Sequence, residues 1–143
     1  MSNFDTVSAI TENIQAILNR EGVFFSRKSF DDRKSIPASL FPLGRIFYAG
    51  ESFEYSHGQK PLYAEVEYTI RVELSEKDPY EMMREQQRWA HCIRGALTVD
   101  ALNTGELAAS KHVSRVVVAG VEADNGRNAS SLILRTIVRY RES

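Results

Sequence analysis

The sequence predicts an α+β domain: a mostly antiparallel sheet of about four to five strands packed against two main helices. Residues 4–20 and 79–97 repeat apolar side chains every three or four positions, the spacing of one helix face. Residues 64–74 alternate apolar and polar side chains, the spacing of a strand with one buried face. Near the end of the chain, Asn125-Gly126 separates two strand-like stretches and predicts a hairpin, because both residues tolerate positive φ.

Length, net charge and cysteine content limit the classes of protein to which the chain can belong. The length of 143 residues fits a single domain spanning residues 1–143. The net charge of −1 gives no overall attraction to nucleic acid or to a membrane surface. The single cysteine, Cys92, cannot form an internal disulfide. Neither a signal peptide nor a membrane-spanning stretch is recognisable, so the chain is expected to stay in the cytosol.

The first helix is predicted over residues 4–20. Its apolar side chains lie on one face: Val7, Ile10, Ile14, Ile17 and Leu18. Asn3 or Asp5 is the candidate to cap its start, and Gly22 marks its end. The polar residues 26–39 that follow predict a loop.

The next stretch, residues 40–49, is apolar and aromatic and predicts a strand. Pro42 and Gly44 favour an edge position or a bulge at the start of that strand. Residues 50–61 are rich in glycine, serine and polar side chains. They predict a long, mobile connection that can hold a short strand at residues 53–55.

The strand at residues 64–74 turns directly into the second helix. Its predicted buried face consists of Ala64, Val66, Tyr68, Ile70, Val72 and Leu74. Asp78 can accept hydrogen bonds from the first free N–H groups of the helix, and Pro79 suits the first helical position. The helix is expected to run to about Leu97, with its core stripe formed by Met82, Gln86, Trp89, Ile93 and Leu97.

The last third of the chain begins with residues 98–112, which show no clean period and predict a loop that can hold one helical turn. Strands follow at residues 113–122 and 129–141, paired as a hairpin. In the last strand, one face carries Leu132, Leu134, Val138 and Tyr140. The predicted order is therefore α-β-(β)-β-α-β-β, with the helices on one face of the sheet.

No catalytic, cofactor or metal site is predicted. The three histidines are isolated from one another: His57, His91 and His112. They lack the spacing of metal ligands. Cys92 follows His91 on a helix, where neighbours point about 100° apart and do not form a nucleophile–base pair. Asp31-Asp32 lies among basic residues and is typical of a solvated charge cluster.

Arginines recur at even spacing on the last predicted strand: Arg135, Arg139 and Arg141. The favoured interpretation is a solvated sheet face, with these side chains paired to Glu65, Glu67 or Glu73 on neighbouring strands. The alternative is a polar face against another subunit or against a phosphate backbone.

Two stretches carry a resemblance to a known family. The stretch "YTIRVELSEKDPYEMMREQQRWAHCIRGAL" (68–97) resembles the strand–helix unit of the tail terminator (tail-completion) proteins of long-tailed bacteriophages. The stretch "VSRVVVAGVEADNGRNASSLILRTIVRYRE" (113–142) is similar to the closing hairpin of the same family. The resemblance covers most of the chain in the order of its elements.

The resemblance implies a structural virion protein without a reaction or a cofactor. Such a protein forms a homohexameric ring that caps the tail tube, ends its growth and offers the surface to which the filled head joins. The implied partners are the chain itself, the tail tube protein and the head–neck connector, with DNA passing only transiently through the lumen and no membrane. The ring would reside in the virion tail, after assembly in the bacterial cytoplasm.

Within such a ring, two sets of residues are candidates for contact. The charged face of the strand at 64–74 provides candidate subunit contacts: Glu65, Glu67, Arg71 and Glu73. The arginines of the last strand are candidates to face the lumen or the DNA: Arg135, Arg139 and Arg141.

Two other functions compete with this one. Another neck, connector or minor tail protein shares a similar order of elements. A small ligand-binding or enzymatic α+β domain would instead place a pocket between the helices and the sheet, near Tyr48, Trp89 and His91.

Overall fold

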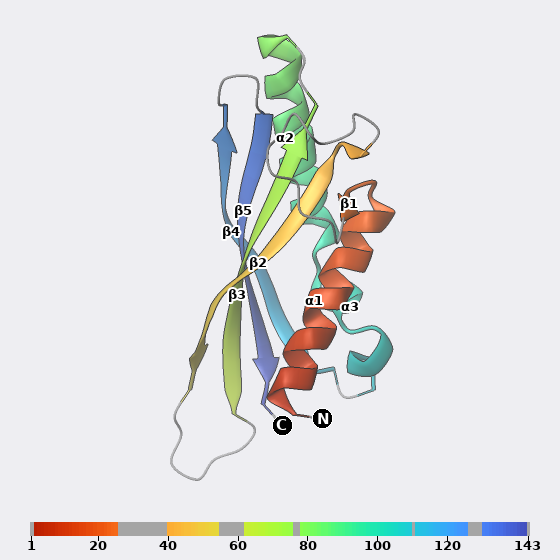
Figure 1. The fold of residues 1–143 in the computed structure, drawn as a ribbon. Helices are drawn as coiled ribbons and strands as arrows, with labels where there is room; N and C mark the ends of the chain where they lie inside the picture. The colour runs from red at the N-terminus through yellow and green to blue at the C-terminus, as the bar shows by residue number, and fades with distance from the viewer. Residues whose placement is uncertain are drawn as a thin grey trace.

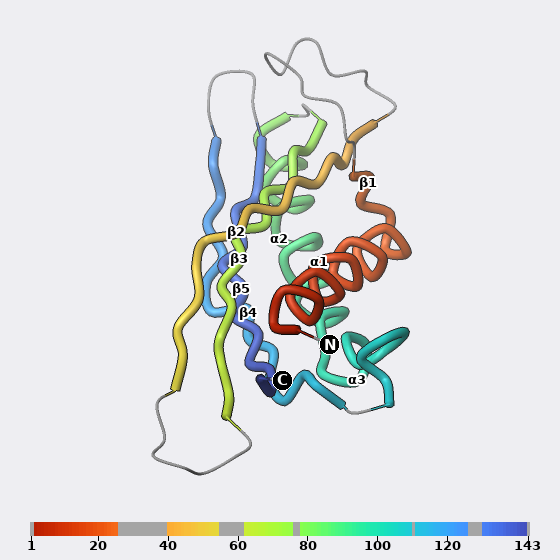
Figure 2. Tube along the Cα trace, turned by 60° about the horizontal axis from the view of Figure 1, so that its bottom comes forward, coloured from red at the N-terminus to blue at the C-terminus, as the bar shows by residue number. Residues whose placement is uncertain are grey.

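In the computed structural model, the described residues form one sheet of five strands with the helices on one face (Figures 1 and 2). The structure describes residues 2–25, 40–54, 62–75, 78–109, 111–125 and 130–142. The strands are β1 Phe24–Phe25, β2 Leu43–Phe53, β3 Tyr63–Leu74, β4 Val113–Asp124 and β5 Ser130–Arg141. The helices are α1 Asn3–Arg20, α2 Pro79–Ala96, α3 Val99–Leu102 and the 3₁₀ turn η3 Gly105–Leu107. The predicted α+β class is confirmed.

Strand β3 lies at the centre of the sheet, whose order is β1-β2-β3-β5-β4. β3 pairs with β2 and with β5, antiparallel to both. All six side chains predicted for its apolar face are buried: Ala64, Val66, Tyr68, Ile70, Val72 and Leu74. α1 packs against this face and buries Ile10, Ile14 and Leu18 completely. α2 adds Trp89 and Ile93 to the same core, so the helices and the sheet share one apolar layer.

The helix starts are fixed by side-chain caps. Asp78 caps α2 as predicted, because its carboxylate accepts hydrogen bonds from the N–H groups of Tyr80 and Glu81. For α1 both predicted cap residues, Asn3 and Asp5, are wrong. Ser2 is the cap residue, and Asp5 three positions later accepts a hydrogen bond from the Ser2 N–H, which completes a capping box.

Strand β2 is longer than the sequence predicts. It continues past Gly50 to Phe53, and its bulge lies between Tyr48 and Gly50 instead of at its start. Gly50 has a φ of 133°, a conformation that a side chain disfavours, and this lets the strand bend without losing its pairing with β3. Tyr55 and the rest of the predicted connection to residue 61 lie outside the described residues.

The remaining segments are the short strand β1, residues 98–112 and the C-terminal hairpin. β1 was not predicted; it pairs in parallel with the start of β2, so β2 is not the edge at Leu43 and Gly44. The predicted loop at 98–112 contains α3 and η3, which bury Leu102 and Leu107. The predicted antiparallel pairing of β4 and β5 is confirmed. Gly126 of the predicted turn and the predicted loop at 26–39 lie outside the described residues.

Gly44 and Gly95 make a matched pair for testing this packing. A Cβ built on Gly44 lies 2.6 Å from a ring carbon of Phe25 and 2.7 Å from Cγ1 of Val23. We expect Gly44→Ala to lower the free energy of unfolding by about 1–3 kcal/mol through overpacking. Gly95 on α2 has open space around it, so Gly95→Ala should raise the free energy of unfolding by about 0.5–1 kcal/mol.

Urea unfolding of the two variants beside the wild type measures both effects. An unchanged urea midpoint for Gly44→Ala would contradict the described packing of β2 against residues 23–25.

Candidate functional site

The face of the sheet opposite the helices is charged, and both sets of sequence-predicted site residues lie on it. In the strand registers, its charged side chains are Arg45, Arg71, Arg115, Arg135, Arg139, Arg141, Glu65, Glu67, Glu73, Glu122 and Asp124. The candidate subunit contacts of β3 therefore stand directly beside the candidate lumen arginines of β5. We call this surface the open face.

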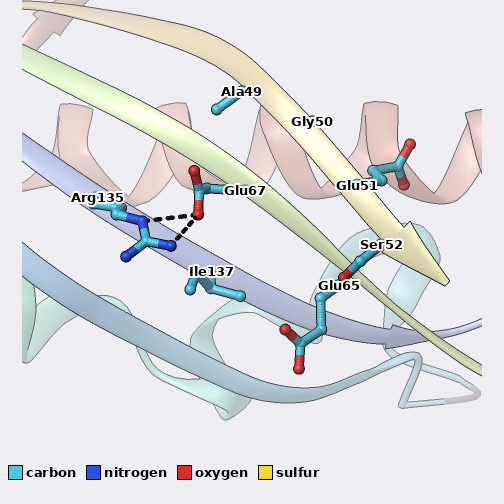
Figure 3. A pocket seen from close by; sticks show the side chains of 8 residues that line it. All are labelled: Ala49, Gly50, Glu51, Ser52, Glu65, Glu67, Arg135 and Ile137. Atoms are coloured by element: carbon cyan, nitrogen blue, oxygen red, sulfur yellow. Dashed lines mark hydrogen bonds and ion pairs between the residues drawn. The ribbon is translucent and has the colours of Figure 1, made fainter. Parts of the chain in front are cut away.

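Arg135 pairs across the strands with Glu67. Its Nε and Nη2 atoms both lie 2.8 Å from Oε1 of Glu67. Dashed lines in Figure 3 mark the two contacts. The interpretation of Arg135 as part of a paired sheet face is confirmed. Because the Arg135 side chain is exposed, water screens this pair and limits its contribution to stability.

Arg71 holds a second group of charges. Its guanidinium lies 2.7 Å from Glu73 and 3.2 Å from Asp124 at the end of β4. It also donates to the hydroxyl of Ser131 at 3.2 Å. The hydrogen bond to Glu73 raises the pKa of Arg71. Glu73 itself is only 7% exposed, so its carboxylate acts within the chain and offers little surface to a partner.

Arg139 and Arg141 complete the predicted lumen set. Arg139 forms an ion pair of 2.7 Å with Glu54 at the end of β2, and its guanidinium lies 4.6 Å from the ring centroid of Tyr63. The predicted partner Glu65 stands directly opposite Arg139 but forms no ion pair with the described residues. The backbone N–H of Arg141 donates to the carbonyl of His112, which fastens the end of β5.

An open pocket of about 310 Å³ lies on this face beside the β2 bulge (Figure 3). It is lined by Ala49, Gly50, Glu51, Ser52, Glu65, Glu67, Arg135 and Ile137. Glu67 and Arg135 already neutralise each other there, so the pocket holds no free pair of acid and base. The described residues also contain no group of three or more His, Cys, Asp or Glu side chains able to hold a metal ion.

The residues expected to line an enzymatic pocket do not converge. Tyr48 is 60% exposed on β2, and its hydroxyl donates to Glu51 at 2.7 Å. Trp89 is buried, with the guanidinium of Arg88 5.1 Å from its ring centroid. His91 is exposed, two positions further along α2, and therefore points nearly opposite to Trp89.

The other candidate groups from the sequence are equally separate. The Cys92 thiol is half-buried and donates to the carboxylate of Glu21 at 3.4 Å, while burial raises its pKa. A raised thiol pKa is typical of an inert cysteine. His57 and Asp31-Asp32 lie outside the described residues. None of the helices in the described ranges combines the length and apolar character needed to cross a membrane.

A cluster of tyrosines around Glu51 was not predicted. The Glu51 carboxylate accepts hydrogen bonds from Tyr140 at 2.6 Å and from Tyr48 at 2.7 Å, so it joins β2 to β5 across β3. Nearby, the Tyr68 hydroxyl lies 2.9 Å from the hydroxyl of Thr11 on α1. Burial raises the pKa of Tyr68 to about 12 and also raises the pKa of Tyr140. The cluster fixes the part of β2 beyond its bulge.

Comparison with known proteins gives no family assignment: no protein-family model and no curated protein matches the chain.

The open-face ion pairs differ in burial, and two matched variants test this difference. Glu73→Gln removes the charge that faces Arg71 at a buried position, so we expect the free energy of unfolding to fall by about 1–3 kcal/mol. Glu67→Gln weakens an exposed pair and should cost at most about 1 kcal/mol. Urea unfolding measures both values. A larger loss for Glu67→Gln than for Glu73→Gln would contradict this ranking.

The buried tyrosines predict a loss of stability at alkaline pH. The folded chain keeps Tyr68 and Tyr140 protonated, whereas the unfolded chain releases their protons near pH 10. Below pH 10, these two tyrosines should therefore add no pH dependence to the free energy of unfolding. It should fall toward pH 12 by up to about 1.4 kcal/mol per pH unit for each tyrosine.

Urea unfolding at several pH values measures the slope, and the Tyr68→Phe/Tyr140→Phe variant is the control. That variant should lose less stability as the pH rises. An identical slope in both proteins would show that the two hydroxyls are not protected.

Proposed function

We propose that this chain is a structural virion protein, a tail terminator of long-tailed bacteriophages. Six copies form a ring that caps the tail tube, ends its growth and presents the surface to which the filled head joins. The observation that carries the proposal is the one-sided sheet. Its helix-covered face forms the core, and its other face is charged, with Arg71, Arg135 and Arg139 paired within the chain.

An assembly role agrees with the chemistry of that face. Arg71, Arg135 and Arg139 each have a carboxylate partner in the same chain. Charges that are already paired are poorly placed to bind a substrate or to transfer a proton. They are typical instead of a hydrated structural surface.

The balance of charge also suits a channel for DNA. A protein holds a phosphate backbone tightly when unpaired lysines and arginines displace its counterions. Arg135 and Arg139 face Glu67 and Glu54, so these two arginines would release few counterions and hold DNA weakly. With the open face toward the ring lumen, DNA would pass through the ring without being retained.

Native mass spectrometry over a concentration series tests the ring, with negative-stain electron microscopy of the same samples. We expect a discrete hexamer, with little dimer or trimer, and class averages with a central opening. The copy that closes the ring forms two contacts, one with each neighbour, but loses its translational and rotational freedom only once. The closed ring is therefore more stable than the open chains that precede it. A chain that stays monomeric or stops at a dimer at every concentration would contradict the proposal.

A further inference from the structure

The sheet has an open edge on each side within the part of the chain that is described. β4 is the last strand in the order and pairs only with β5. On the other side, β1 covers β2 only at Leu43 and Gly44, so the described structure leaves β2 open from Arg45 to Phe53. Figure 1 shows β2 as a long strand that continues well beyond β1. An open edge presents unpaired N–H and C=O groups and is a template for another strand.

We propose that copies of this chain join head to tail, with β4 of one copy pairing with β2 of the next. The inference rests on the proposed ring and names the contact that builds it. β2 and β3, β3 and β5, and β5 and β4 are all antiparallel, so β2 and β4 run in opposite directions. A rotation about an axis along the strands preserves these directions. The two edges would therefore meet as an antiparallel ladder, in a contact that can close a ring.

The charges at the two edges match across one row of the sheet. Arg45 on β2 stands opposite Arg71, and two like charges at opposite positions are destabilising. Arg71 is paired with Glu73 and Asp124, so Arg45 gains no partner from it. The row continues through Ile133 and ends at Glu122 on β4. Neither Arg45 nor Glu122 has an ion-pair partner among the described residues. In a ring, this row would set Arg45 of one copy beside Glu122 of its neighbour.

The next two residues of β2 also match, in shape and polarity, the β4 residues that share their rows. Ile46 lies in the row of Val121, a side chain that is 45% exposed. Phe47, 50% exposed, lies in the row of Gly120, and a Cβ built on Gly120 has no atom within 4 Å. An aliphatic pair and an aromatic ring over an edge glycine are both stabilising cross-strand contacts.

The bulges limit the contact to this segment. β4 changes register between Val118 and Gly120, and β2 changes register between Tyr48 and Gly50. A bulge interrupts regular pairing and protects an edge from indiscriminate association. Between Gly120 and Asp124 the register of β4 is regular. The proposed ladder therefore centres on the contact of Arg45 with Glu122.

Two charge reversals test the pairing. Arg45→Glu alone places two carboxylates in every contact, and Glu122→Arg alone places two guanidinium groups there, so each variant should lose the hexamer peak in native mass spectrometry. Mixed in equal amounts, the two variants should recover it, because alternating copies restore an opposite pair at every contact. The recovered oligomers should contain the two variants at one to one. The double variant Arg45→Glu/Glu122→Arg should also assemble alone.

Matched control reversals are Glu12→Arg on α1 and Arg94→Glu on α2, both exposed on the helix layer. They should leave the hexamer unchanged, and circular dichroism should show that every variant is folded.

Single reversals at Arg45 or Glu122 that assemble like the wild type would overturn the pairing and leave the ring standing. Folded single variants that fail to assemble when mixed would overturn it equally. A wild-type chain that never forms an oligomer would overturn the ring and the pairing together.

Discussion

The structure depends on the alternation of side chains along β3. Successive residues of a strand point to opposite faces, and every second residue of β3 is apolar and buried. Both flanking strands and both main helices are placed by this strand. β2 and β5 extend its buried face, and α1 and α2 cover it. The charged residues between them must then share the other face, so the division into a core and an open face follows from one periodic pattern.

The pairing of charges on the open face has two consequences. In the interior of the sheet, Arg71 and Arg135 are paired with carboxylates of the same chain, so neither guanidinium carries an unpaired charge. At the edges, Arg45 and Glu122 stand without such partners among the described residues. Unpaired charges at opposite edges of one row give the chain a polarity from edge to edge. A heterologous contact between identical copies uses this kind of polarity.

The sequence predicted the features that depend on local spacing. These include the helix ending at Arg20, the strand around Tyr68 and the cap at Asp78, whose apolar periods and capping residues lie within a few positions of one another. It did not predict three features that arise from contacts between distant segments. β1 is two residues long, and Glu51 meets Tyr140 only after β2, β3 and β5 have come together. β2 extends beyond Gly50 because β3 continues to pair with it, which no local pattern records.

Hydrogen–deuterium exchange of the assembled protein and of a dilute sample shows whether copies join through the open edges of the sheet. Backbone amides of β3 and β5 are paired within the chain and should exchange slowly in both samples. If copies pair through their open edges, outward-facing amides between Arg45 and Tyr48 and between Gly120 and Asp124 should become protected only on assembly. Equal exchange of these edge amides in an assembled sample and a dilute one would contradict assembly through the two edges.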